Sequence, residues 1–262
     1  MQRVSAFIYG LFAYAVFFLT FLYSIAFVGG FLGPRTVDGG GSRDGLAAAL
    51  LIDAALLLVF AVQHSVMARP AFKRWWTRLV PVSVERSTYV LLSSLALVLL
   101  FWQWRPLTGV VWELESPLAR NTVWALFASG WILVLLSTFL INHFDLFGLR
   151  QVWLRLRKRP YRPLEFRLTS LYTVVRHPLL LGFLIAFWAA PTMTVGHLVF
   201  SVATTGYILV AVRFEERDLV RRHGEAYEAY RKATPMLLPL PGKRAPKELL
   251  ALDRVRRDAP TV

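Results

Sequence analysis

Long apolar runs, each close to the length of a membrane-spanning helix, constrain this fold more than any other feature of the sequence. A helix needs about 20 apolar residues to cross the hydrocarbon core of a bilayer. Five runs in this sequence approach that length. A sixth, from Pro178 to Ala190, is shorter and is ended by Pro191. We therefore predict an all-α, polytopic transmembrane helical bundle of five to six apolar helices, of which the last two form a hairpin. The five longer runs are Val4–Leu32, Leu46–Met67, Ser87–Trp104, Asn121–Ile141 and Thr194–Val212.

The composition supports a membrane protein and removes several kinds of site. Hydrophobic residues make up 56% of the chain and the mean hydropathy is +0.50, which is more apolar than a soluble domain. The first apolar run is too long for a signal peptide, so we expect it to be a permanent helix. The absence of cysteine excludes disulfides, thiolate metal sites and cysteine nucleophiles.

The basic residues are divided unevenly between the two sides of the predicted bundle. Of the 30 Lys and Arg residues, only four lie in the connections predicted for one side, namely Arg35, Arg43, Arg105 and Arg120. Because Lys and Arg collect on the cytoplasmic side of a membrane protein, the net charge of +14 reflects topology and does not indicate a nucleic-acid partner. We predict an integral protein of the bacterial inner (plasma) membrane, in contact with membrane lipids. A cytoplasmic C-terminal helix is predicted to start near Arg213.

The chain is divided where its character changes. Residues 1–142 are predicted to hold the four N-terminal transmembrane helices. Residues 143–242 combine a basic connector, the helical hairpin and the C-terminal helix. Residues 243–262 are charged and have little apolar periodicity, which predicts a loosely held tail.

Four predicted helix ends bring polar side chains to the cytoplasmic face. Ionisable residues at membrane depth are costly and usually functional. Arg176 and His177 precede Pro178, which suits the first turn of a helix, where free N–H groups and the helix dipole favour an anion. The same residues also fit a simple interfacial anchor. The full set is Gln63 and His64, His143 and Asp145, Arg176 and His177, and Arg213, Glu215 and Glu216.

Several motifs near the end of the chain together resemble a known family. Val175–Arg176–His177–Pro178 is followed by Arg213–Phe–Glu215–Glu216, and then by Gly224-x-x-Tyr227-x-x-Tyr230 and Pro235. This combination resembles the isoprenylcysteine carboxyl methyltransferase-like family, whose members are integral membrane enzymes that use S-adenosylmethionine. The resemblance implies that residues 143–242 form the cofactor site. The implied cofactor-binding residues are Tyr172, Val175, Arg176, His177, Gly182, Glu215, Glu216, Tyr227 and Tyr230.

Simpler interpretations of these residues stay open, and the sequence departs from the family at two points. Glu215 and Glu216 also fit a solvated helix face paired with nearby arginines, and the tyrosines also fit the packing of an amphipathic helix. Leu180 stands where the family often has Tyr, and Ser170–Leu171–Tyr172 replaces its usual Gly-Pro-Tyr. These departures argue against a prenylcysteine substrate.

The N-terminal half carries a second resemblance. Residues 63–70, Gln-His-Ser-Val-Met-Ala-Arg-Pro, resemble the NnrU-like branch, and residues 142–151 resemble the membrane-bound methanethiol S-methyltransferases. The resemblance implies methyl transfer from S-adenosylmethionine to methanethiol, a small volatile thiol, with dimethyl sulfide and S-adenosylhomocysteine as products. The alternatives are another thiol, hydrogen sulfide, an isoprenylcysteine or a lipid as acceptor, or a non-catalytic NnrU-like protein with a transport or assembly role.

The acceptor chemistry requires a thiolate, because the thiolate is the nucleophilic form. His64 and His143 are the candidate bases, since imidazole titrates near neutrality. Asp145 can orient His143 only if the helix has already ended there, because residues two apart on a helix do not face each other. Arg213 completes the predicted catalytic set. No His-x3-His or similar spacing favours a metal site, and His197 is predicted to be structural.

Overall fold

The computed structural model describes residues 2–33, 35–40, 44–162 and 170–245. Most of the predicted tail, from residue 246 onward, lies outside the described residues. The long helices are α1 (Arg3–Gly29), α2 (Leu46–Ala68), α4 (Val82–Gln103), α5 (Pro117–Ile141) and α9 (Val195–His223), with the shorter apolar helix α8 (Pro178–Trp188). The remaining elements are α3 (Pro70–Trp76), α6 (His143–Leu146), α7 (Leu149–Leu156), the 3-10 helix η1 (Ser170–Thr173), α10 (Glu225–Ala233), β1 (Val110–Glu113) and β2 (Thr192–Thr194).

The five long helices are each long and apolar enough to cross a membrane. Many of their apolar side chains face outward, such as Leu19, Leu51 and Leu58, each more than 60% exposed. Outward-facing leucines suit a lipid environment, and they would be unusual in such numbers on a soluble monomer. The prediction of an all-α, polytopic transmembrane bundle is confirmed, and the chain is an integral membrane protein.

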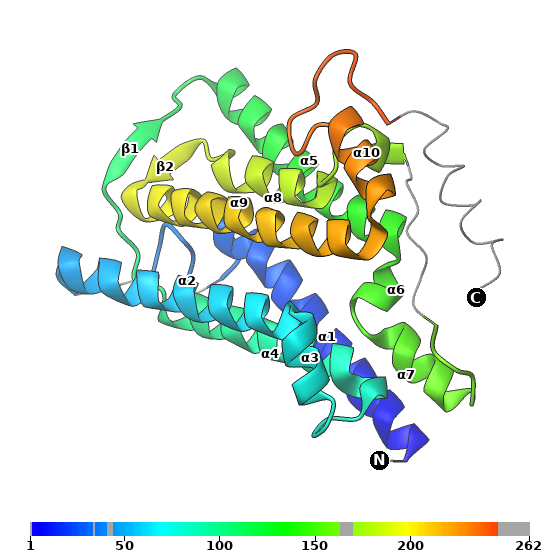
Figure 1. Cartoon of the computed structure of the whole chain (residues 1–262). Helices are drawn as coiled ribbons and strands as arrows, with labels where there is room; N and C mark the ends of the chain where they lie inside the picture. The colour runs from blue at the N-terminus through cyan, green and yellow to red at the C-terminus, as the bar shows by residue number, and fades with distance from the viewer. Residues whose placement is uncertain (1, 34, 41–43, 163–169, 246–262) are drawn as a thin grey trace.

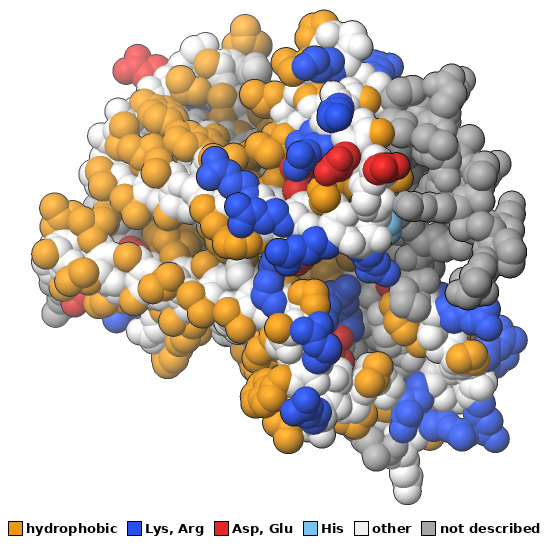
Figure 2. Space-filling view, in the orientation of Figure 1, with side chains coloured by type: hydrophobic (Ala, Val, Ile, Leu, Met, Phe, Trp, Pro, Cys, Tyr) orange, Lys and Arg blue, Asp and Glu red, His pale blue; other side chains and the backbone are white. Residues whose placement is uncertain are grey.

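The chain runs six times between two ends of the molecule (Figure 1). One end holds β1 and β2, which pair antiparallel and join the connection before α5 to the turn between α8 and α9. The other end holds the start of α1, together with α3, α6, α7 and α10. Lys and Arg side chains gather over this second end, whereas apolar side chains dominate the first (Figure 2). The even number of passes therefore brings α10 to the same end as the N-terminus.

Helix α8 packs against α5 with backbone-to-backbone contact. A Cβ atom added at Gly182 would lie 2.7 Å from the carbonyl oxygen of Gly130 and 2.8 Å from the amide nitrogen of Val134. A Cβ added at Gly130 would lie 2.7 Å from the nitrogen of Ala186, so the two helices run antiparallel. Small residues at such crossings let helix backbones approach closely. The start of α8 is thereby held level with the last turns of α5.

Helix α9 differs from the prediction at its polar end. We expected the apolar run to stop at Val212 and a separate helix to start near Arg213, and this was wrong. The helix continues without a break to His223 and ends at Gly224, whose φ is 57°. No Gly or Pro lies between Val212 and His223, so nothing in the backbone interrupts the helix. The change from apolar to charged residues after Val212 therefore does not mark the end of the helix.

Candidate active site

A buried cluster of charged side chains joins α8, α9 and α10 at the basic end. The carboxylate of Glu216 accepts a hydrogen bond from Nε of Arg176 at 2.6 Å and lies 3.1 Å from Nε2 of His177. The side chains of Arg176 and Glu216 are only 9% and 11% exposed. A buried carboxylate is tolerated when it is paired and hydrogen-bonded, as it is here. The structure thus brings together the two motifs that the sequence placed far apart.

Arg176 also fixes the chain that follows α10. Its Nη1 donates to the carbonyl oxygens of Arg231 at 2.7 Å and Thr234 at 2.5 Å. An arginine that satisfies the last carbonyls of a helix opposes the negative end of the helix dipole. The backbone N–H groups of Arg176 and His177 donate to the carbonyls of Pro235 and Met236. Hydrogen bonds from the backbone and from the Arg176 side chain therefore join the segment before α8 to the segment after α10.

The two tyrosines of α10 face inward beside this cluster. Tyr227 and Tyr230 are both 2% exposed, and their ring centroids lie 5.7 Å apart. The hydroxyl of Tyr230 donates to the carbonyl oxygen of Tyr172 at 2.5 Å. Burial raises the pKa of both hydroxyls, so both stay protonated donors. These contacts dock α10 onto the 3-10 helix η1.

Two hydroxyl groups around the cluster have no hydrogen-bond partner among the described residues. They are Oη of Tyr172 and Oγ1 of Thr234, and both atoms are buried. Burial raises the pKa of Tyr172, with Glu215 nearby adding to the effect, so its hydroxyl remains a donor. Buried polar groups are nearly always satisfied in native proteins. Unpartnered hydroxyls at this position suit a site that receives a polar ligand.

The other predicted cofactor residues are placed differently. Val175 is a core residue, only 4% exposed, and Gly182 faces α5 rather than the charged cluster. Glu215 is 55% exposed and lies 3.7 Å from Nδ1 of His177, so it borders the cluster on its solvent side. Arg213 is exposed on α9 and makes no hydrogen bond or ion pair within the described part of the chain.

His143 is a buried histidine whose proton position follows from its neighbours. Its Nδ1 lies 2.9 Å from Oγ1 of Thr138, and its Nε2 lies 2.8 Å from the hydroxyl of Tyr14. The Thr138 hydroxyl already donates to the carbonyl of Leu135 at 2.7 Å, so it must accept from His143. His143 therefore carries its proton on Nδ1, and its Nε2 accepts the Tyr14 hydroxyl. Burial lowers the pKa of His143, which favours this neutral form.

Asp145 has partners other than His143. Helix α5 ends at Ile141, and Asn142, with φ of 153°, starts the separate short helix α6. The Asp145 carboxylate pairs with Nη1 of Arg150 at 2.9 Å and accepts from the hydroxyl of Tyr161 at 3.4 Å. The helix therefore does end before Asp145, as an interaction with His143 would require. Among the described residues, however, the Asp145 carboxylate contacts side chains of the following connector and not His143.

His64, near the end of α2, lies against α4. The hydroxyl of Tyr89 lies 3.0 Å from both ring nitrogens of His64, and Oγ of Ser93 lies 3.3 Å from Nδ1. Phe60 stacks on the other side of the imidazole, with ring centroids 5.2 Å apart. Tyr14 and Tyr89, the tyrosine partners of the two histidines, were not predicted. Both lie in aromatic-rich apolar helices, where a tyrosine gives no separate signal.

An aromatic layer connects the two histidines. Phe17 stacks on Phe147 with ring centroids 3.8 Å apart, and Phe147 lies 4.8 Å from the His143 ring. Phe17 and Phe147 also pack on the buried cluster that contains Tyr89. His64, through Tyr89, and His143, through Phe147, thus border one packed aromatic layer.

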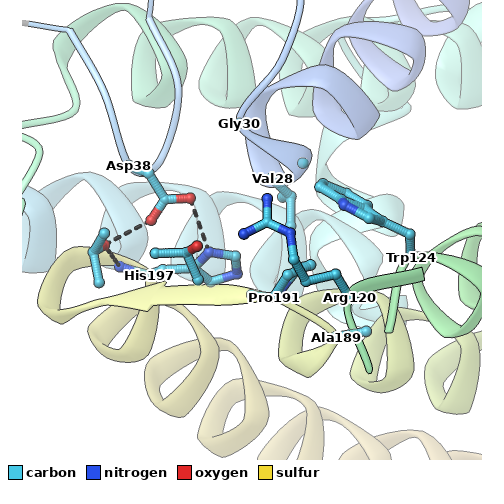
Figure 3. Close-up of a pocket in the computed structure, with 12 residues that line it drawn as sticks. Val28, Gly30, Asp38, Arg120, Trp124, Ala189, Pro191 and His197 are labelled. Atoms are coloured by element: carbon cyan, nitrogen blue, oxygen red, sulfur yellow. Dashed lines mark hydrogen bonds and ion pairs between the residues drawn. The ribbon is translucent and has the colours of Figure 1, made fainter. Parts of the chain in front are cut away.

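A pocket lies at the opposite end of the molecule, where Arg120 and Trp124 face Asp38 and His197 (Figure 3). The Asp38 carboxylate accepts from the hydroxyl of Thr194 at 2.6 Å and lies 3.1 Å from Nδ1 of His197. Nε2 of His197 lies 3.0 Å from the carbonyl of Phe187. These contacts tie the loop after α1 to the start of α9, in agreement with the structural role predicted for His197. Among the described residues, no group of three or more His, Asp or Glu side chains is placed to hold a metal ion.

Comparison with known proteins gives consistent matches over most of the chain. The family model described as NnrU protein matches residues 52–240. A methanethiol S-methyltransferase from Mycobacterium tuberculosis is 55% identical over 92% of this chain and 98% of its own length. One from Crocosphaera subtropica is 52% identical over 94% of this chain and 96% of its own length. Nurim from Mus musculus is 32% identical over 66% of this chain and 69% of its own length.

No solved structure gives a significant match. The family match covers most of the chain, from within α2 to beyond α10, and therefore includes His64, His143 and the Arg176–Glu216 cluster. The chain belongs to the NnrU protein family and to the family of the methanethiol S-methyltransferases that it matches over nearly its whole length.

Proposed function

We propose that this protein transfers a methyl group from S-adenosylmethionine to methanethiol, giving dimethyl sulfide and S-adenosylhomocysteine. The observation that carries the proposal is the identity of 50% or more, over at least 90% of the chain, to several relatives named methanethiol S-methyltransferase. Because these matches span nearly the full length of the relatives, they include the membrane helices as well as the charged cluster.

The charged cluster fits a methyl donor of this kind. Nη2 of Arg176 and Oε2 of Glu216 take part in none of the hydrogen bonds that join the cluster in the described residues. The guanidinium group can therefore still donate to a carboxylate, and the carboxylate can accept from an ammonium or a hydroxyl group. The unpartnered hydroxyls of Tyr172 and Thr234 add two further donors. When bound, S-adenosylmethionine supplies a methyl group already activated on a sulfonium.

The residues that would act on the thiol are His64 and His143. A free thiol is mostly protonated near neutral pH, and only its thiolate is a good nucleophile. Each imidazole lies in an aromatic, partly dehydrated environment beside one tyrosine hydroxyl. Either ring can accept a proton if the thiol displaces that hydroxyl. The apolar helices around them suit a small apolar acceptor that arrives through the lipid.

We place the site at the cytoplasmic face of a bacterial plasma membrane. Of the four Lys and Arg residues outside the basic end, the described ones, Arg35, Arg105 and Arg120, lie toward the β1–β2 end. The rest of the described basic residues lie toward the end that holds the charged cluster, and Lys and Arg mark the cytoplasmic side. A cytoplasmic opening gives a charged, water-soluble donor direct access to Arg176 and Glu216.

The test is to purify the protein in lipid nanodiscs, measure S-adenosylmethionine binding by calorimetry, and quantify headspace dimethyl sulfide after addition of methanethiol. We expect both binding and product formation. A protein that is folded but binds no S-adenosylmethionine would refute the enzymatic proposal. Binding without product would refute methanethiol as the acceptor, and hydrogen sulfide and larger thiols would then be assayed in the same way.

A further inference from the structure

Arg86 occupies a central position at the basic end, in the first turns of α4. The residue after it, Ser87, is fixed against the turn between α6 and α7, because a Cβ added at Gly148 would lie 2.6 Å from Oγ of Ser87. On its own helix, Cζ of Arg86 lies 5.9 Å from the ring centroid of Tyr89, which in turn contacts His64. Arg86 is therefore placed between the end of α2 and the α6–α7 segment.

The guanidinium group of Arg86 is half-buried and has no hydrogen-bond or ion-pair partner within the described part of the chain. Two carboxylates at this end of the molecule are paired with other arginines, and the neighbouring Glu85 makes no hydrogen bond or ion pair with Arg86 within the described residues. Asp145 binds Arg150 at 2.9 Å, and Asp218 binds Arg69 at 3.0 Å. None of its nitrogens is among the fully buried, unpartnered polar atoms of the described residues, so they remain reachable from solvent. The donors of this guanidinium group are therefore open to a ligand.

Most of the charged groups around Arg86 are cationic. Burial lowers the pKa of Lys73; the positive charges of Arg86 and Arg222 add to that effect, and the negative charge of Glu85 opposes it. Figure 2 shows basic side chains massed over this part of the molecule. An anion held here would offset the repulsion between the cations. The charged and titratable groups that surround Arg86 are His64, Lys73, Glu85, Tyr89, Tyr161 and Arg222.

We propose that Arg86 binds the methyl acceptor as its thiolate, and that it is a catalytic residue of the reaction. This inference rests on the proposed function. Two observations favour the thiolate over the carboxylate of the methyl donor. Arg86 is next to the Tyr89–His64 pair, where the acceptor loses its proton, and the donor cluster has its own cations in Arg176 and His177.

The step balances with the groups present. The S–H bond of the thiol breaks, its proton passes to a ring nitrogen of neutral His64, and the electron pair stays on sulfur beside Arg86. The sulfur then forms a bond to the methyl carbon as the bond from that carbon to the sulfonium breaks, and the electron pair of that bond stays on the departing sulfur. No oxidant or metal is needed. Arg86 contributes by stabilising the negative sulfur before and during attack.

The test compares Arg86→Gln and Arg86→Lys with Arg78→Gln, which changes an exposed arginine in the turn before α4. For Arg86→Gln we expect kcat/KM for methanethiol to fall about tenfold to a hundredfold. The acid limb of the pH–rate profile should move to higher pH. Arg86→Lys should recover most of the loss because it restores the charge, and Arg78→Gln should match the wild type.

A second measurement avoids turnover altogether. With S-adenosylhomocysteine in place of the donor, the ultraviolet absorption of bound thiolate is recorded as methanethiol is added at increasing pH. The wild-type protein should show thiolate at a lower pH than Arg86→Gln, with unchanged affinity for S-adenosylhomocysteine. This result separates a loss of thiolate from a loss of fold, because the folded variant still binds the adenosyl ligand.

Three outcomes would overturn the inference. Arg86→Gln could retain wild-type kinetics and thiolate absorption, or it could weaken binding of the methyl donor while leaving thiol kinetics intact. Equal losses in Arg86→Gln and Arg86→Lys would also exclude a charge effect. A wild-type protein that methylates no thiol would instead refute the proposed function, so the two failures are distinguished by the wild-type control.

Discussion

The substitution Glu216→Gln tests the charged cluster with almost no change of shape. Its Oε1 accepts from Arg176 at 2.6 Å and faces His177 at 3.1 Å. Glutamine keeps an oxygen in that position but removes the negative charge. Breaking a buried ion pair from one side costs about 3–5 kcal/mol when the remaining charge is left uncompensated. Arg176 keeps two carbonyl acceptors, on Arg231 and Thr234, so a smaller loss than this range, about 2–3 kcal/mol, is expected.

That energy sets the expected loss of binding. Glu216 holds the Arg176 guanidinium where it can meet the donor, and its own Oε2 is a candidate acceptor for donor hydroxyl or ammonium groups. A loss of about 2 kcal/mol corresponds to roughly a thirtyfold rise in Kd. Calorimetric titration of S-adenosylmethionine into the protein in nanodiscs measures this directly. The matched control is Glu228→Gln, the same substitution at an exposed position of α10, which should leave Kd within twofold, a change of at most about 0.4 kcal/mol.

The stability of each variant must be followed alongside its affinity. Glu216→Gln should also lower the melting temperature, because the cluster joins α8, α9 and the end of α10. If Glu216→Gln remains folded and binds S-adenosylmethionine as tightly as Glu228→Gln does, the carboxylate has no part in the donor site. The paired charges would then serve only to dock α10.

Three further predictions concern other parts of the molecule. His64→Ala should lower kcat about 10²–10⁴-fold, the usual effect of losing a general base, while leaving the Kd for S-adenosylmethionine unchanged; full turnover at every pH would exclude His64 as the base. Gly182→Ala should destabilise the protein by about 1–3 kcal/mol through overpacking, because its Cβ would meet backbone atoms of α5; Gly206→Ala, which meets nothing within 4 Å, is the control in thermal unfolding. Burial lowers the pKa of His143 below the ordinary histidine value of 6.5, so its contribution to stability is complete above that pH and is lost as the pH falls toward the folded-state pKa. The melting temperature should therefore fall on acidification, and a His143→Gln variant with the same pH slope would contradict this.

The apolar sequence predicted the long helices well because each apolar run specifies its own element. The run predicted for Leu46–Met67 forms α2 at Leu46–Ala68, and that predicted for Asn121–Ile141 ends where α5 ends. Starts were less accurate, since α4 begins at Val82 in a polar turn before the apolar residues. The ribbon of β1 and β2 was not predicted. Strands of three or four residues carry too little periodicity, and their pairing depends on segments distant in sequence.

Site residues that belong to a sequence motif could be predicted. Site residues that are brought together only by tertiary contacts could not. Arg176, His177 and Glu216 do meet, as the combined motif indicated. Gly182 belongs to the same motif, but its position on α8 turns it toward α5. In the sequence, Arg86 was only one of the many Lys and Arg residues predicted for the cytoplasmic side. That it forms no ion pair within the described residues becomes clear only from the structure, in which Arg150 and Arg69 pair with Asp145 and Asp218.

The two candidate bases differ in a way that bears on where the thiol is activated. His143 donates from Nδ1 to Thr138 and accepts from Tyr14, and within the described residues it has no charged hydrogen-bond partner. A thiolate formed beside it would be buried without a counter-charge, which is strongly unfavourable. His64 has Arg86 within reach across the Tyr89 ring, so a thiolate there would be compensated. We therefore propose His64 as the proton acceptor, with His143 holding the end of α5 against α1.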